Sequence, residues 1–575
     1  MNFSNAAMPG RGQPAFCRDV IIGLICLSAV TASSLAAKEA EQQDPDTELA
    51  NLLAMRVPEL QRRYNVPGVA IALWQDGKEP VVFNFGVTDA RTKAPITDDT
   101  TFQVASISKL VTGALVLQLR DAGEISLDEP IGFYLHSFAL PPSQWTERDV
   151  TIRRILNHTA GLSVHGYFPG SVIPGEMPTL QQSLEGNLND AEKVELVAEP
   201  GRGYRYSGGG FSLLQLALEE KYNAPFARLA EDRLFKPLGL SAASFEADAI
   251  LDGAGAQPHD SAGKAMPQRA FANVAAGGLV INAGELAMLA EAVLGKGPLH
   301  GKLLTNEGQF LLTSPSAIGE ATSRGVTMEQ AMVAPGSAPG PYLIRPTLGA
   351  MIATRGDGSH VIGHTGSNVG WKAAVEYVPE TGAGIAVLTN SETGNGILLP
   401  VVCEWLKVQD RARGVSADRH CPEFGLALLE AAYARDGVDG MQSAYSKMHN
   451  ASPGAYLFDD WTAVGFVISL FAQRDLGLLD MADILAAGQV VLRDNAVGFP
   501  QSGLAASANS LILALAGKGD EACREASRAM STGPLEEQAS GLLGQATSIL
   551  GANCSALEKA FATEKAETAD SAGGK

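Results

Sequence analysis

The sequence predicts an α/β (α+β) fold, in which helices accompany a sheet that is at least partly antiparallel, and a small all-α domain follows. Three observations lead to this prediction. The first is a mixture of strand-like and helical runs, with strands at 68–74, 80–87, 373–378 and 384–391 and helices at 107–121, 211–222 and 284–295. The second is an Asp-Gly pair between the first two strands, which favours a tight antiparallel hairpin. The third is a change after residue 410 to a composition rich in Ala, Leu and Gly with a helical period.

The first 37 residues have the pattern of an export signal. Arg11 and Arg18 precede an apolar run at 20–32, and small residues follow this run up to Ala36. A membrane span needs about 20 apolar residues, so the run is short for an uncleaved anchor, which is the alternative interpretation. We therefore expect a signal peptide at 1–37, no stable membrane span after its cleavage, and a periplasmic or secreted protein.

Four of the six cysteines lie outside this predicted signal peptide. An even number of cysteines in an exported chain favours disulfides, because the compartments outside the cytosol are oxidising. The spacing suggests that Cys403 pairs with Cys421 and that Cys523 pairs with Cys554. Four free, buried cysteines are the alternative.

The C-terminal part contains two stretches that resemble each other. Residues 465–492 and 507–530 each suggest a helix, a turn and a second helix, which resembles tetratricopeptide-like helix pairs without forming a regular array. The expected division of the chain is a signal peptide at 1–37, a main domain at 45–410, a linker at 411–425, a helical domain at 426–560 and a disordered tail at 561–575.

Charge and motif content exclude several classes of function. The formal net charge is −20, which argues against a nucleic-acid partner because Lys and Arg supply most of the affinity for phosphates. No Cys-x-x-Cys pair or His-Glu-x-x-His helix is present, so neither a metal nor another cofactor is expected. A small molecule or a peptide is the expected substrate. Any protein partner or self-association is expected to involve the C-terminal helices.

The best candidate for chemistry is a Ser-x-x-Lys sequence at the start of the predicted helix 107–121. Residues three apart share a helix face, so Lys109 can reach the hydroxyl of Ser106. A serine becomes a strong nucleophile when a nearby base removes its proton, and a helix N-terminus favours the negative charge that develops. Lysine can be that base when burial or a neighbouring cation lowers its pKa well below about 10.4.

This spacing alone has a structural alternative, an N-capping serine beside a solvated lysine. The pair Ser261 and Lys264 has the same spacing in a glycine-flanked loop, which shows how weak the motif is by itself. Two further stretches strengthen the catalytic interpretation. Tyr206 lies in a Gly-rich turn directly before a helix, and residues 364–366 lie at the entry to a predicted strand.

In this order, the stretches resemble the serine hydrolases that include class C β-lactamases, penicillin-binding DD-peptidases, D-aminopeptidases and some esterases. The resemblance rests on Ser-Ile-Ser-Lys at 106–109, Tyr-Ser-Gly at 206–208, His-Thr-Gly at 364–366 and the sequence ILNHTAGL at 155–162, and it spans about 50–405. It implies a β-lactamase/transpeptidase-like fold, in which an antiparallel sheet is flanked by helices and accompanied by a helical subdomain. It also implies an acyl-enzyme mechanism.

The resemblance assigns the chemical steps to three side chains. Ser106 would attack the substrate carbonyl, while Lys109 takes or relays the serine proton. Tyr206 would move a proton to and from the leaving group and later the water. Whether Lys109 or Tyr206 is the base stays open at this point.

The same resemblance places the supporting groups. Backbone N–H groups of Ser106 and Ser367 would stabilise the oxyanion. Thr365 and Gly366 are expected at the substrate, with Thr365 orienting it. His364 would position the catalytic tyrosine or a substrate carboxylate.

Two departures from the β-lactamase pattern narrow the substrate. Gly208 stands where β-lactamases and many DD-peptidases have Asn, so a contact to the substrate amide is missing. His364 stands where β-lactamases carry Lys, and an imidazole with an ordinary pKa near 6.5 attracts a carboxylate less strongly at neutral pH. A D-amino-acid peptidase or an esterase is therefore expected before an efficient β-lactamase.

Other features have structural interpretations. We expect His158 to stabilise a turn under the site and Trp371 to be a core residue of its strand. The loop at 164–170 either lines the cleft or packs on itself. The alternative to an enzyme is a catalytically silent penicillin-recognition or scaffold protein that acts through its helical C-terminal domain.

Overall fold

The computed structural model describes residues 45–554 apart from 168–169, 187–192, 317–342, 356, 416–420, 452–454, 459, 476–480, 499–500, 533–534 and 536. The chain divides into two units, residues 1–55 and residues 56–575. The helix α2 (Pro45–Tyr64) contains the end of the first unit and the beginning of the second. The predicted signal peptide at 1–37 and tail at 561–575 lie outside the described residues.

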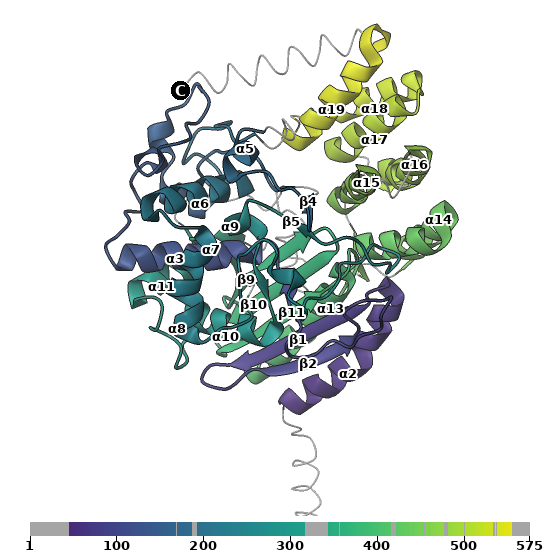
Figure 1. Ribbon diagram of the computed structural model, residues 1–575. Coiled ribbons are helices and arrows are strands. Elements are labelled where there is room, and N and C mark those ends of the chain that lie inside the picture. The colour runs from purple at the N-terminus through teal and green to yellow at the C-terminus, as the bar shows by residue number, and fades with distance from the viewer. Residues whose placement is uncertain are drawn as a thin grey trace, which may run out of the picture. The chain divides into compact units, whose positions relative to one another are not determined.

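A seven-stranded antiparallel sheet forms the centre of the main domain, with the order β2-β1-β11-β10-β9-β8-β7 (Figure 1). Its strands are β1 (Gly68–Gln75), β2 (Val81–Gly86), β7 (Leu343–Pro346), β8 (Met351–Thr354), β9 (His360–Asn368), β10 (Trp371–Val378) and β11 (Ala383–Thr389). The hairpin β1–β2 forms at the Asp-Gly pair, and the four predicted strands are β1, β2, β10 and β11. The prediction of an antiparallel sheet is thus confirmed.

Helices cover the sheet on both faces. Every residue of β10 and β11 is buried, which requires cover on each side because neighbouring side chains of a strand point to opposite faces. The helix α10 (Ala283–Leu294) contacts β1 and β11, and α13 (Asn395–Ala412) contacts β10 and β11. Trp371 lies in this core edge-to-face with Phe102, as its sequence position suggested.

The remaining α-helices described in the main domain include the helix that follows Ser106 and carries Lys109. They are α3 (Ile107–Asp121), α4 (Ile152–Leu156), α5 (Leu180–Leu184), α6 (Gly208–Tyr222), α7 (Phe226–Ala230), α8 (Lys236–Leu238), α9 (Val274–Gly277) and α11 (Asn306–Thr313). Two-residue strands pair as β3 (Phe102–Gln103) with β6 (Val280–Ile281) and as β4 (Ser171–Val172) with β5 (Arg269–Ala270). The helix α3 has the predicted bounds, and α6 begins three residues earlier than predicted.

The C-terminal part is helical, as predicted. It contains α14 (Gly425–His449), α15 (Asp460–Asp475), α16 (Met481–Gly498), α17 (Gly503–Leu515), α18 (Gly519–Ser531) and α19 (Glu537–Leu550), together with the strand pair β12 (Glu423–Phe424) and β13 (Tyr456–Leu457). Helices α15 to α19 follow one another in green to yellow in Figure 1. Contacts connect α15 with α16 and α17 with α18, so the two stretches expected to form helix pairs do so. Gly437 breaks α14 with a φ of 64°.

Two disulfides join the four cysteines in the pattern that their spacing suggested. Cys403 bonds to Cys421 and Cys523 bonds to Cys554. The first disulfide connects α13 to the segment before α14, and the second connects α18 to the end of the helical part. Among the described residues, no helix combines the length and the apolar character needed to cross a bilayer.

Glu376 of β10 is a fully buried carboxyl, and its oxygens accept no hydrogen bond from the described residues. Burial raises its pKa well above the usual range of a glutamate. A raised pKa keeps the proton on the folded state after the unfolded chain has lost it, so stability falls as pH rises above about 4.3. Relative to Glu376→Gln, we expect wild type to lose about 1.4 kcal/mol of unfolding free energy per pH unit from about pH 5 upward.

Urea unfolding at about pH 5, 6 and 7 measures this difference. The exposed Glu521 offers a matched control, because Glu521→Gln removes a carboxylate from the solvent-facing surface of α18. Its unfolding free energy should follow the wild-type pH dependence. A Glu376→Gln variant that also follows wild type would contradict the prediction.

Candidate active site

Ser106 lies on a tight turn between β3 and α3. The preceding Ala105 has a φ of 47°, a left-handed conformation that is strained for a residue with a Cβ. Ser106 occupies the N-cap position of α3, but its side chain makes no capping hydrogen bond. Ser108 holds the turn instead, since its Oγ donates to the Ala105 carbonyl at 2.6 Å and accepts from Leu279 N at 2.9 Å. The N-capping alternative for Ser106 is therefore wrong.

The amino group of Lys109 lies directly against Ser106. Lys109 is only 2% exposed, and its Nζ donates to Ser106 Oγ at 3.2 Å and to the carbonyl oxygen of Ala276 at 2.6 Å. The same Nζ lies 4.9 Å from the ring centre of Tyr206 and 5.7 Å from that of Phe211. The alternative of a solvated lysine is thus wrong as well. The geometry allows a proton to pass between Lys109 and Ser106.

The second Ser-x-x-Lys sequence has a different environment. Ser261 is buried, while Lys264 is exposed in a turn whose backbone is held by Asp260. No hydrogen bond joins the two side chains among those described. The comparison shows that burial of the lysine against the serine, rather than spacing, distinguishes the pair on α3.

The ring of Tyr206 is held by two histidines. His158 stacks on it with ring centres 4.3 Å apart, and the ring of His165 lies 4.8 Å away. The Nδ1 of His158 accepts a hydrogen bond from the Ser207 backbone N–H at 3.1 Å. Burial, and then the neighbouring charge of Lys109, holds the pKa of His158 well below its usual value, so this imidazole is neutral. His158 supports the tyrosine turn, as the sequence suggested.

The strand β9 brings the His-Thr-Gly sequence to the nucleophile turn. A Cβ on Gly366 would lie 2.0 Å from the carbonyl oxygen of Val104, so only glycine permits this approach. His364 and Thr365 are buried, and His364 Nδ1 lies 2.6 Å from the Thr365 carbonyl oxygen. A carbonyl only accepts, so Nδ1 carries the hydrogen. The ring of His364 lies 6.3 Å from that of Tyr206.

A cavity of about 460 Å³ connects most of the predicted site residues. Five of them line it: Ser106, Lys109, Tyr206, Gly208 and Ser367. The other three, His364, Thr365 and Gly366, lie in β9 and are absent from its lining. The role expected for Thr365 in orienting the substrate therefore has no direct support from the cavity wall. Residues 165–167 of the loop at 164–170 line the cavity, while Val164 and Tyr167 also pack in the hydrophobic core.

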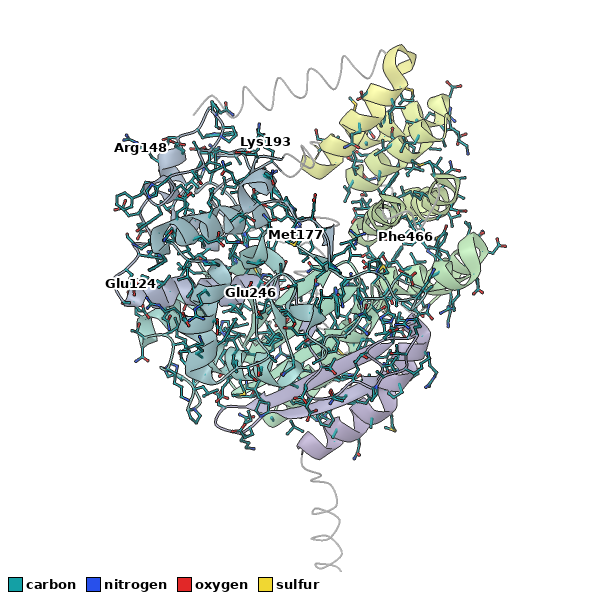
Figure 2. The ribbon with its side chains drawn as sticks, viewed as in Figure 1. Glu124, Arg148, Met177, Lys193, Glu246 and Phe466 are labelled. Atoms are coloured by element: carbon teal, nitrogen blue, oxygen red, sulfur yellow. A yellow bond between two sulfur atoms is a disulfide. The ribbon has the colours of Figure 1, made fainter. Side chains whose placement is uncertain are left out.

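Several lining residues were not identified from the sequence. Asn368 donates from Nδ2 to Gln103 Oε1 and to the Gly277 carbonyl oxygen, both at 3.1 Å, and so connects β9 to the segment that holds Lys109. A second group comes from the C-terminal helices: Leu426 and Glu430 of α14 and Gly465, Ile468 and Ser469 of α15. Figure 2 labels the neighbouring Phe466, a buried residue of α15. No motif or spacing connects these residues with the Ser-x-x-Lys sequence.

Gly208 packs closely under the loop that carries His165. A Cβ at this position would lie 3.0 Å from the His165 carbonyl oxygen and 3.6 Å from the Cα of Gly166, so a side chain there displaces the loop. We expect Gly208→Asn to lower the unfolding free energy by about 1–3 kcal/mol and to produce no nitrocefin hydrolysis. Thermal melting and a nitrocefin assay measure both effects.

Gly203 provides the matched control for this substitution. A Cβ on Gly203 meets nothing within 4 Å, so Gly203→Asn should melt close to wild type. Equal melting of the Gly208 and Gly203 variants, or efficient nitrocefin turnover by Gly208→Asn, would show that the packing under His165 does not restrict this position.

Comparison with known proteins gives consistent similarities. The model of the Beta-lactamase family matches residues 44–398. Penicillin-binding protein 4 of Amycolatopsis lactamdurans is 32% identical over 185 residues, which are 32% of this chain and 46% of that protein. A D-aminopeptidase of Brucella anthropi is 27% identical over 195 residues, or 33% of this chain and 35% of the other. The chain thus spans less than half the length of these two curated relatives.

A solved structure extends the comparison to the fold. The D-amino acid amidase from Ochrobactrum anthropi SV3, complexed with L-phenylalanine amide, aligns with 64% of this chain and 100% of its own. The TM-score is 0.51 at 20% sequence identity. This likeness confirms the predicted fold class of the main domain.

Proposed function

The chain belongs to the Beta-lactamase family, and from this premise we propose that it is a serine hydrolase that forms an acyl-enzyme through Ser106. The observation that carries the proposal is the buried amine of Lys109, 3.2 Å from Ser106 Oγ at the wall of a cavity that Tyr206 also lines. Burial of a lysine against a serine whose side chain makes no capping hydrogen bond has no evident structural purpose. A nucleophile with its base needs this arrangement.

The proposed reaction has two halves. Ser106 Oγ attacks the substrate carbonyl carbon while its proton moves to the amine of Lys109, which takes it in the unprotonated form, and the new C–O bond gives a tetrahedral oxyanion. The bond to the leaving group then breaks, and a proton delivered through Tyr206 neutralises that group. Water then attacks the carbonyl carbon of the acyl-enzyme and gives up a proton through Tyr206 or Lys109. The bond to Ser106 Oγ breaks, Oγ regains its proton, and the carboxylic acid leaves. The backbone N–H groups of Ser106 and Ser367 would stabilise both oxyanions.

For the substrate we propose a D-amino-acid amide or peptide, or a carboxylic ester, in preference to a β-lactam. Gly208 places no amide group at the cavity, and His364 supplies no permanent positive charge. We further propose that residues 1–37 direct export, that residues 45–410 form the catalytic domain, and that residues 426–560 form a separate helical domain after the linker at 411–425.

A substrate panel tests the proposal. D-alanine p-nitroanilide, a D-Ala-D-Ala peptide, a short-chain p-nitrophenyl ester and nitrocefin are offered to the full-length protein, alongside a fluorophosphonate probe. Hydrolysis of an amide, peptide or ester, with nitrocefin slowest, supports the proposal. Fastest turnover of nitrocefin would refute the reasoning from Gly208 and His364. The scaffold alternative predicts no turnover and no adduct.

A further inference from the structure

The C-terminal helices form part of the wall of the catalytic cavity. The first residues of α14, 425–432, are all buried, and Leu426 and Glu430 among them line the cavity with Ser106. Gly465 and Ser469 of α15 line the same cavity. The disulfide between Cys403 and Cys421 fixes the chain only a few residues before α14. The helical part therefore contributes polar as well as apolar side chains to the wall of this cavity.

An ion pair between a buried lysine and a half-buried glutamate lies beside this wall on the main domain. Lys372 Nζ lies 2.8 Å from Glu392 Oε1, and the other carboxylate oxygen of Glu392 accepts from Gly370 N at 2.7 Å. Lys372 of β10 is directly opposite Ser367 of β9, so the two side chains share one face of the sheet. The ion pair is thus one strand away from the proposed oxyanion site, and its positive charge is already neutralised.

Glu430 adds a second carboxyl to the same place. Its side chain lines the cavity, the residue is only 6% exposed, and Ser469 hydrogen-bonds to it. Burial and the nearby charge of Glu392 raise the pKa of Glu430 to about 8, although Lys372 acts in the opposite direction. Two carboxyls therefore face one lysine, and Glu430 is mostly protonated at neutral pH until a second positive charge enters the cluster and favours its ionised form.

Asn395 supplies an independent indication of a ligand. It is the first residue of α13, it is 5% exposed, and it lines the cavity. Its Oδ1 accepts no hydrogen bond from any described residue. A buried acceptor without a donor is costly, and such groups in native proteins call for a missing partner. That partner has to be a donor.

We propose that Glu430 and Asn395 bind the protonated amino group of the substrate, which makes the C-terminal helices a specificity element for substrates with a free amine. This inference rests on the proposed function. An ammonium group offers three donors and one positive charge: its donors match the acceptor Asn395 Oδ1, and its charge stabilises the ionised form of Glu430. A substrate carboxylate fits poorly, because Lys372 is already paired with Glu392 and Glu430 supplies no positive charge. The subsite therefore favours aminoacyl amides, peptides or esters over their N-acylated forms.

Binding measurements test the subsite without catalysis. Full-length Ser106→Ala protein is titrated calorimetrically with D-alaninamide and with N-acetyl-D-alaninamide. We expect the free amine to bind at least about tenfold more tightly, and Glu430→Gln in the same background to remove that preference. Asn395→Ala, which leaves the carboxylate in place, should weaken the amine about three- to tenfold. Glu521→Gln, on the exposed surface of α18, should keep the preference.

Equal binding of the two amides, or an amine preference that survives Glu430→Gln with an unchanged melting temperature, overturns the inference. A catalytic measurement separates it from the proposed function. In wild type, Glu430→Gln should lower the ratio of kcat/KM for D-alanine p-nitroanilide to that for its N-acetyl form at least about tenfold. Hydrolysis that depends on Ser106 but shows no amine preference keeps the proposed function and refutes the subsite. An amine preference in binding without any turnover keeps the subsite and refutes the proposed function.

Discussion

Replacement of Ser106 by alanine should abolish covalent labelling by a fluorophosphonate and lower kcat/KM on the best substrate by about 10⁴- to 10⁶-fold. The reason is chemical: without Oγ there is no atom to form the acyl-enzyme, and only binding and oxyanion contacts remain. The side chain caps no helix, so its removal should leave the melting temperature near that of wild type. Gel fluorescence and steady-state kinetics measure the two effects.

The chain provides its own control for this experiment. Ser261 begins the second Ser-x-x-Lys sequence, is buried and lies in a loop away from the predicted helix pattern. Ser261→Ala should label and turn over substrate as wild type does. Labelling that persists in Ser106→Ala and disappears in Ser261→Ala would move the nucleophile and refute the proposed mechanism.

The second large effect is expected at Lys109. Lys109→Met keeps a side chain of similar length in the buried site but removes the amine that lies against Ser106 and the Ala276 carbonyl. Loss of a general base costs about 10²- to 10⁴-fold in rate, so acylation should slow by that factor. The rate of fluorophosphonate labelling, measured under single-turnover conditions, reports acylation directly. Circular dichroism and thermal melting confirm that the variant is folded.

Lys264→Met is the matched control, because Lys264 occupies the same position in the second sequence and is exposed. It should label at the wild-type rate. Near-normal labelling of Lys109→Met would exclude the lysine as the base. In that case Tyr206 would be left as the candidate for the base.

The sequence predicted those parts of the fold that depend on local pattern. The helix at 107–121 was found with its bounds because its apolar residues recur at a helical period. The hairpin β1–β2 followed from a single Asp-Gly pair. The cysteine pairs followed from spacing in sequence. The division into domains and the export signal stay predictions.

The site was predictable only in part. Ser106 and Lys109 share one helix turn, so their spacing in sequence fixes their spacing in space. Glu430 and Asn395 reach the same cavity through the packing of α13 and α14, which leaves no mark in the sequence near either residue. The requirement for glycine at position 366 also comes from packing between distant segments, because the carbonyl oxygen that leaves no room for a side chain belongs to Val104. Contacts between distant segments are the part that local reasoning misses.

The place of β1 in the sheet has a consequence for biosynthesis. β1 pairs on one side with its hairpin partner β2 and on the other with β11, which begins at Ala383. At about 5–20 residues per second, a ribosome needs roughly 15 to 60 s to make the roughly 300 residues between them. Throughout that time the apolar edge of β1 has no neighbour. Such an edge invites pairing with other chains, so newly made protein should depend on a holding chaperone until β11 emerges.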